Sequence, residues 1–87
     1  MPLTRINNYE WEGNFILFVN LGPKPNKLTN NYSVMTTDGI ELGQIKWFSN
    51  WRKYAFYPKP ETLYEETCLQ DIAEFCKQET LNRKNTR

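Results

Sequence analysis

The residues best suited to chemistry lie in one stretch, residues 43–58, which combines positive charge with aromatic rings and contains no acid. Lysine and arginine neutralise phosphates, and accessible rings stack on nucleobases. Because alternate side chains of a strand share one face, such residues can line a single surface. The candidate binding residues are Lys46, Phe48, Trp51, Arg52, Lys53 and Tyr57. Their types and spacing indicate binding to DNA or RNA.

The sequence contains few of the residue types and motifs that enzymes use for catalysis. The chain has no histidine and no glycine-rich phosphate loop, so the usual Ser-His and Cys-His pairs are excluded. Two pairs of carboxylates, Glu65 with Glu66 and Asp71 with Glu74, are expected to be solvated and to favour the helix dipole. We therefore predict a binding domain that is not an enzyme, with no catalytic residue and no cofactor.

The two cysteines, Cys68 and Cys76, are eight residues apart in a predicted helix. That spacing corresponds to about 12 Å along the helix axis, which is too far for a disulfide. Without histidine, the cysteines also lack partners for a zinc site. Two buried free thiols are typical of a reducing cytosol, so we expect no metal and a cytoplasmic location.

Composition bounds the class of protein. The chain has 87 residues, which suits a single domain with one small core, and a formal net charge of +1. That balance excludes an acidic DNA mimic and a histone-like polycation. The charges are segregated, because residues 42–60 carry only bases, residues 61–74 only acids, and bases prevail again in the tail. The longest apolar run, residues 15–19, is too short to cross a membrane, and no signal peptide is apparent.

The first half of the chain predicts strands and one long loop. Residues 9–12 indicate a short strand, and the apolar residues 15–19 a buried one. Glycine, prolines and asparagines in residues 21–31 indicate a loop, and residues 32–37 predict the next strand. Residues 1–8 and 82–87, at the two ends, are expected to be flexible.

Two turns and a bulge are expected in the second half. Asp38-Gly39 suits a two-residue type I′ hairpin turn. Gly43 interrupts the apolar alternation of the strand that follows, which indicates a β-bulge. Ser49-Asn50 is predicted to form a second two-residue turn, which would pair Phe48 with Trp51.

The turn at Ser49-Asn50 decides which side chains share a face. One face would pack under the helix and carry Ile45, Trp47, Arg52, Tyr54 and Phe56. The other would carry Gln44, Lys46, Phe48, Trp51, Lys53, Ala55 and Tyr57. A three-residue turn would instead mix the two sets.

A C-terminal helix completes the predicted fold. Thr67 and Gln70 form a capping-box pattern, and the helix is expected to continue to about residue 81. Its buried stripe is predicted from the apolar residues at helical spacing, namely Leu69, Ile72, Ala73 and Cys76, flanked by Cys68 and Phe75. We predict an α+β fold in which one helix packs on one face of an antiparallel β-meander of three to five strands.

Three segments carry a resemblance to other proteins. They are residues 23–29, the glycine, aromatic and basic residues of 43–58, and residues 68–75, which begin Cys68-Leu69 and end at Phe75. In these segments the chain resembles small uncharacterised single-domain proteins of bacteria, phages and mobile elements. The resemblance implies a compact domain in a bacterial or phage-infected cytoplasm. It implies no site residues, because the group has no known function.

Two functions remain open from the sequence. In the first, the basic aromatic face of the sheet binds DNA or RNA. In the second, Trp51, Arg52 and their neighbours anchor a host protein, as in a phage-type binding module or inhibitor. Either function suits a monomer or a homodimer formed by edge-strand pairing, and neither involves a membrane.

Overall fold

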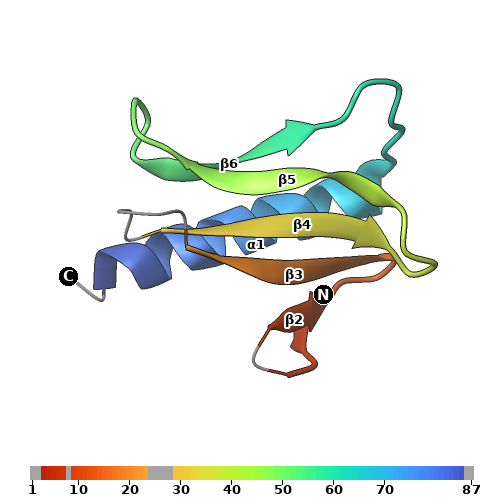
Figure 1. The fold of residues 1–87 in the computed structure, drawn as a ribbon, viewed down its shortest axis with the longest axis horizontal. Coiled ribbons are helices and arrows are strands. Elements are labelled where there is room, and N and C mark those ends of the chain that lie inside the picture. The colour runs from red at the N-terminus through yellow and green to blue at the C-terminus, as the bar shows by residue number, and fades with distance from the viewer. Residues whose placement is uncertain (1–2, 8, 24–28, 86–87) are drawn as a thin grey trace.

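A computed structural model of the chain describes residues 3–7, 9–23 and 29–85. Six antiparallel strands form one sheet in chain order, and one helix packs on a face of it (Figure 1). The elements are β1 (Thr4–Arg5), β2 (Glu10–Glu12), β3 (Ile16–Pro23), β4 (Asn30–Thr36), β5 (Glu41–Phe48), β6 (Lys53–Pro58) and α1 (Glu66–Asn85). The predicted α+β meander with a C-terminal helix is confirmed, but the predicted three to five strands are wrong.

The additional strand is β1, because β2 lies within residues 9–12, where a short strand was predicted. β1 pairs with β2, and β2 pairs with β3, so two short strands extend the sheet beyond its buried centre. Trp11 on β2 is held by its ring contacts with Tyr32 and Phe75, at centroid distances of 6.0 and 5.4 Å. The two-residue β1 is too short to show the alternation by which a strand is recognised from sequence. The predicted flexible ends, residues 1–8 and 82–87, lie partly outside the described residues.

The core lies between α1 and the sheet. Phe75 on the helix stacks on Phe18 of β3 with ring centroids 4.4 Å apart. The buried apolar side chains are Ile16, Phe18, Tyr32, Val34, Ile45, Tyr54, Ile72 and Phe75. In Figure 1, α1 runs behind the sheet along the strand direction, so the other face of the sheet is left open. No helix in the described part of the chain is long and apolar enough to span a membrane.

The β4–β5 hairpin forms at Asp38-Gly39 as predicted, but its turn has three residues. The Thr36 amide donates to the Ile40 carbonyl at 2.8 Å, which closes a loop over residues 37–39. Gly39 is the one described residue of this turn with a positive φ, at 96°. A two-residue type I′ turn needs two such residues, so the chain adopts the three-residue turn with glycine in the left-handed position.

The predicted bulge at Gly43 is confirmed. Val34 pairs with Gly43 whereas Met35 pairs with Glu41, so one residue of β5 has no partner in β4. A Cβ atom on Gly43 would come within 2.5 Å of the Tyr57 carbonyl oxygen. Glycine therefore allows β6 to approach the bulged strand closely.

The predicted two-residue turn at Ser49-Asn50 is wrong. Phe48 pairs with Lys53 and Trp47 pairs with Tyr54, so the turn covers the four residues 49–52. Arg52 ends it in a left-handed conformation, with φ at 54°. Because the register moves by two residues, every strand residue keeps its predicted face. Trp51 and Arg52, which were expected on opposite faces of the strand, lie instead in the turn.

The helix begins earlier than predicted and is capped by another residue. The carboxylate of Glu65 accepts a hydrogen bond from the Cys68 amide at 2.7 Å, so Glu65 takes the capping position predicted for Thr67. This bond lowers the pKa of the Glu65 carboxyl, because it favours the charged form. The helix then continues to Asn85, one turn beyond the predicted end.

The buried stripe of α1 also differs from the predicted one. Ile72 and Phe75 are buried, but Leu69 is 51% exposed and Ala73 is exposed. Polar residues take their place in the interface with the sheet, namely Asp71, Glu79 and Thr80. The helix is therefore rotated away from the orientation that its apolar residues alone would choose.

Asp71 shows why this rotation is stable. Its Oδ2 accepts a hydrogen bond from the Asn14 amide at 2.7 Å, and its Oδ1 accepts one from Asn14 Nδ2 at 3.1 Å. The side chain joins α1 to the turn between β2 and β3, and Asp71 is only 3% exposed. The prediction of a solvated carboxylate is wrong for Asp71, because Asn14 supplies the hydrogen bonds that water would otherwise make.

Candidate functional site

Three of the predicted site residues, Lys46, Phe48 and Tyr57, lie together on the open face of the sheet, with Lys53 beside them at its edge. Phe48 pairs with Lys53 across β5 and β6, and Lys46 pairs with Ala55. The chain neighbours of Lys46, Phe48 and Tyr57 belong to the core, so these three side chains point away from α1. The Lys53 side chain instead lines a hollow beside the helix. The Lys46 Nζ lies 5.0 Å from the centroid of the Tyr57 ring, which is close enough for a cation–π contact.

The other two predicted residues, Trp51 and Arg52, stand at the tip of the β5–β6 hairpin. The Trp51 ring meets the Phe48 ring edge-on with centroids 4.7 Å apart, yet Trp51 remains 67% exposed. Phe48, Trp51 and Tyr57 line an apolar hollow of about 210 Å³, in which Tyr57 is 40% exposed. Two aromatic rings are thus accessible beside the basic residues. We call the six residues Lys46, Phe48, Trp51, Arg52, Lys53 and Tyr57 the hairpin surface.

Helix residues that the sequence analysis did not assign to the site lie at the same end of the molecule. Arg83 and Lys84 line a hollow of about 270 Å³ together with Trp47, Ser49 and Arg52. The Arg83 guanidinium carbon lies 5.7 Å from the centroid of the Trp47 ring. The basic tail was visible in the sequence, but its position beside the hairpin depends on the length and direction of α1.

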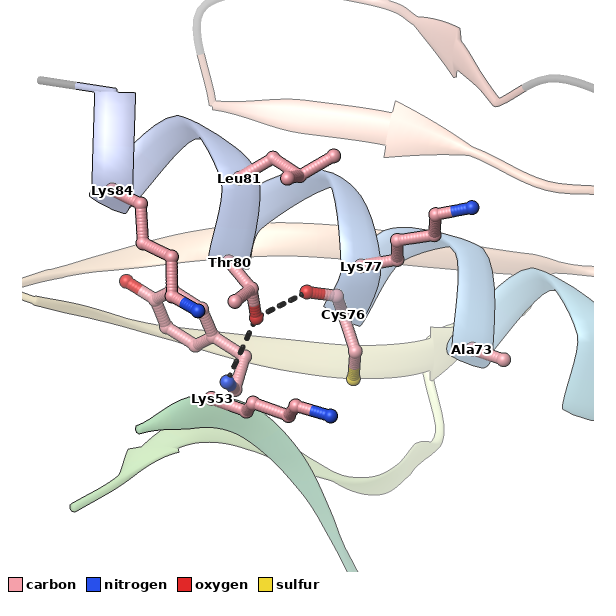
Figure 2. A pocket seen from close by; sticks show the side chains of 8 residues that line it. Lys53, Ala73, Cys76, Lys77, Thr80, Leu81 and Lys84 are labelled. Carbon is pink, nitrogen blue, oxygen red and sulfur yellow. Dashed lines mark hydrogen bonds between the residues drawn. The ribbon is translucent and has the colours of Figure 1, made fainter. Parts of the chain in front are cut away.

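A longer hollow, which we call the α1–β6 groove, separates the helix from the edge strand (Figure 2). It has a volume of about 370 Å³. β6 contributes Lys53 and Tyr54, and α1 contributes Ala73, Cys76, Lys77, Thr80, Leu81 and Lys84. At its floor, Thr80 Oγ1 accepts a hydrogen bond from the Tyr54 amide at 3.0 Å and donates one to the Cys76 carbonyl at 2.8 Å.

The acids of the described chain are engaged or lie elsewhere. The Ser33 hydroxyl donates a hydrogen bond to Glu41, and Lys59 forms an ion pair with it at 3.0 Å; both contacts lower the pKa of the Glu41 carboxyl. Glu79 is buried and accepts a hydrogen bond from the Tyr32 hydroxyl at 2.7 Å. Among the described residues that line the three hollows, none is acidic. Two of these three hollows are therefore lined by basic residues without a lining acid, and the third is apolar.

Comparison with known proteins finds a similar protein in a phage. An uncharacterised 9.3 kDa protein of Acholeplasma phage L2 is 33% identical over 61 residues, which is 69% of this chain and 78% of the phage protein. The chain belongs to the family of this phage protein. The predicted resemblance is thereby confirmed. No family model matches the chain, and no solved structure matches it.

The surroundings of the two thiols do not activate either of them as a nucleophile. Cys68 and Cys76 are both free, as predicted, and both are half-buried. Burial raises the pKa of the Cys76 thiol to about 11 and raises the pKa of the Cys68 thiol. Both thiols therefore stay protonated near neutral pH.

Two buried tyrosines are expected to make the fold less stable at alkaline pH. Burial raises the pKa of Tyr32, and the hydrogen-bonded Glu79 carboxylate raises it further. Burial also raises the pKa of Tyr54. In the unfolded chain both phenols titrate near pH 10. Their contribution to stability is complete below about pH 10 and is lost as the pH rises toward the folded-state pKa values.

We expect the free energy of unfolding to fall progressively above about pH 10. Urea unfolding followed by tryptophan fluorescence across this range measures the fall. Tyr32→Phe removes one of the two phenols and should make the fall shallower. If Tyr32 forms phenolate near pH 10 while the protein remains folded, the expectation is wrong.

Proposed function

We propose that the chain is a small binding domain that holds nucleic acid on the hairpin surface. One observation carries the proposal, which is that the exposed Trp51 ring lines one hollow while its neighbour Arg52 lines a second with Arg83 and Lys84, and no acid lines either hollow. Basic side chains attract phosphates, whereas accessible aromatic rings stack on nucleobases, which is worth about 1–3 kcal/mol per nucleobase. A solvated charge cluster without rings would lack the second contribution.

The distribution of charge along the molecule supports the proposal. In Figure 1 the β5–β6 turn and the end of α1 lie at one end, while the β4–β5 turn and the start of α1 lie at the other. The first end carries the bases of the hairpin surface and the helix end. The second carries the acids Asp38, Glu65 and Glu66. A polyanion would therefore be steered toward the hairpin end.

A protein partner is the second candidate, favoured by exposed leucines on the helix. Leu69 and Leu81 are each 51% exposed on α1, and Leu63 before it is 93% exposed. Such residues, together with Trp51, are the kind that anchor a host protein. This candidate predicts a partner that copurifies with the chain and is released by Trp51→Ala. Pairing of two copies through a sheet edge remains a further prediction. It would use β1, because on the β6 edge the Tyr54 amide already donates its hydrogen bond to Thr80.

The test of nucleic-acid binding is fluorescence anisotropy with labelled DNA and RNA oligonucleotides at several salt concentrations. Three phosphate contacts, from Lys46, Arg52 and Lys53, give a loss of affinity between roughly 50 and 200 mM salt of about twentyfold for a single strand and about fortyfold for duplex DNA. The double substitution Lys46→Glu with Lys53→Glu should abolish binding. Lys59→Glu reverses a charge that lines none of the three hollows and should leave most of the affinity.

Both variants must retain the wild-type circular dichroism and unfolding midpoint for the comparison to count. The absence of any anisotropy change with either nucleic acid at low salt would remove this proposal and leave the protein partner. Equal losses in the Lys59 variant and the double variant would point to unspecific charge attraction.

A further inference from the structure

We propose that the α1–β6 groove forms the second half of the binding site, and that it holds the backbone of a single strand of DNA continuing from the hairpin surface. This inference rests on the proposed function and names its substrate. It adds Lys77 and Lys84, two helix residues outside the predicted site, to the residues that contact phosphate.

The two surfaces are continuous through Lys53 and the hairpin tip. Lys53 is paired with Phe48, yet its side chain also lines the groove, and Figure 2 shows it extending alongside α1 near Cys76. Lys84 lines both the groove and the hollow that contains Arg52. A chain of phosphates can therefore pass from the open face around the tip and into the groove without leaving basic side chains.

The positions of the basic side chains favour a single strand over a duplex. Lys46 lies on the open face of the sheet, whereas Lys77 and Lys84 lie on the helix side of the β6 edge. A duplex has a persistence length of about 150 base pairs and bends around so small a body only at high cost. A single strand bends freely, and its unpaired bases offer their faces to Trp51 and Tyr57.

The floor of the groove favours DNA over RNA. Ala73, Cys76 and Leu81 supply an apolar surface that suits deoxyribose. The Thr80 hydroxyl accepts from the Tyr54 amide and donates its proton to the Cys76 carbonyl, so it has no proton left to donate to a ligand. The 2′-hydroxyl of RNA would thus meet apolar side chains where it needs a hydrogen-bond partner.

Lysine footprinting tests the path of the strand directly. The folded wild-type protein is acetylated with and without a thymidine oligodeoxynucleotide of about 12 nucleotides, a length within the usual range for such sites. Mass spectrometry then compares each lysine. We expect severalfold slower acetylation of Lys53, Lys77 and Lys84, as well as of Lys46. Lys59, which is ion-paired with Glu41 and lines none of the three hollows, is the internal control and should not change.

The possible footprints separate this inference from the function on which it rests. Protection of Lys46 with full reactivity at Lys77 and Lys84 would overturn the groove and leave the hairpin surface as the whole site. No protection at any lysine, together with no binding, would overturn both. Equal protection by a duplex, or by a uridine oligoribonucleotide, would overturn the choice of single strands or of DNA.

Alanine variants give a second measurement that does not depend on footprinting. Lys77 and Lys84 are exposed on α1, so Lys77→Ala and Lys84→Ala should fold normally. Each should lower the slope of log affinity against log salt by about 0.7, which is the value for one phosphate contact on a single strand. Lys59→Ala removes the same charge and should leave the slope unchanged. An unchanged slope in both groove variants would contradict the inference.

Discussion

Replacing Phe75 by alanine will lower the free energy of unfolding by about 3–5 kcal/mol, the largest loss expected from one substitution in the described core. The Phe75 ring is fully buried. It stacks on Phe18 at 4.4 Å and meets Trp11 and Tyr32 edge-on at 5.4 and 4.9 Å. Its removal leaves a cavity between the helix and three strands that these neighbours cannot fill without leaving their own contacts.

Urea unfolding measures this loss, and Leu69→Ala is its matched control. Leu69 lies on the same helix and was predicted to be buried, but it is half exposed, so its loss should cost no more than about 0.5 kcal/mol. Small domains are stable by only about 5–15 kcal/mol, so Phe75→Leu serves as a milder variant if the alanine variant does not fold. Similar costs for Leu69→Ala and Phe75→Ala would mean that α1 is rotated differently.

Gly13→Ala is expected to cost about 2–3 kcal/mol although it adds only a methyl group. A Cβ atom at Gly13 would lie 2.4 Å from Asp71 Oδ2 and 2.7 Å from its carboxyl carbon. The carboxylate cannot retreat without losing its hydrogen bonds to the Asn14 amide and side chain. A buried carboxylate that loses its partners is far more costly than the methyl group itself.

A double-mutant cycle distinguishes this mechanism from a general intolerance of the turn. In the Asp71→Ala background the nearest obstacle to the new methyl group is absent, so Gly13→Ala should cost at least about 1 kcal/mol less than in the wild type. Urea midpoints of the four proteins give the coupling free energy. Additive costs would show that the contact between Gly13 and Asp71 is not what requires glycine.

Hydrogen bonds between residues far apart in the sequence explain which features of the fold could not be predicted from it. The helix, the hairpins and the bulge at Gly43 follow from local signals, and the structure contains them. The orientation of α1 does not, because apolar periodicity selects Leu69 and Ala73 for the interior. Asp71 and Glu79 are buried instead because Asn14 and Tyr32 supply hydrogen bonds from distant parts of the chain. Spacing along a helix carries no information about such partners.

The positions of the candidate site residues could also be predicted only in part, because they depend on turn length and on how the helix packs. The faces of Lys46, Phe48 and Tyr57 were right because the four-residue turn preserves their alternation. The Lys53 side chain lines the hollow beside the helix instead. The positions of Trp51 and Arg52 were wrong, because turn length is weakly determined by residues such as Ser49 and Asn50. Lys77 and Lys84 belong to the proposed site only because α1 packs beside β6, which no local pattern in the sequence describes.

The order of the elements also has a consequence for how this chain is made. Each strand pairs only with its neighbours in sequence, whereas α1 closes the core through bonds such as Tyr32 with Glu79, across 47 residues. At synthesis rates of about 5–20 residues per second, the 20 residues of α1 take roughly one to four seconds to complete. Until then the nascent sheet exposes Phe18, Val34 and Ile45 to solvent. The core of the domain therefore closes only once the helix has left the ribosome.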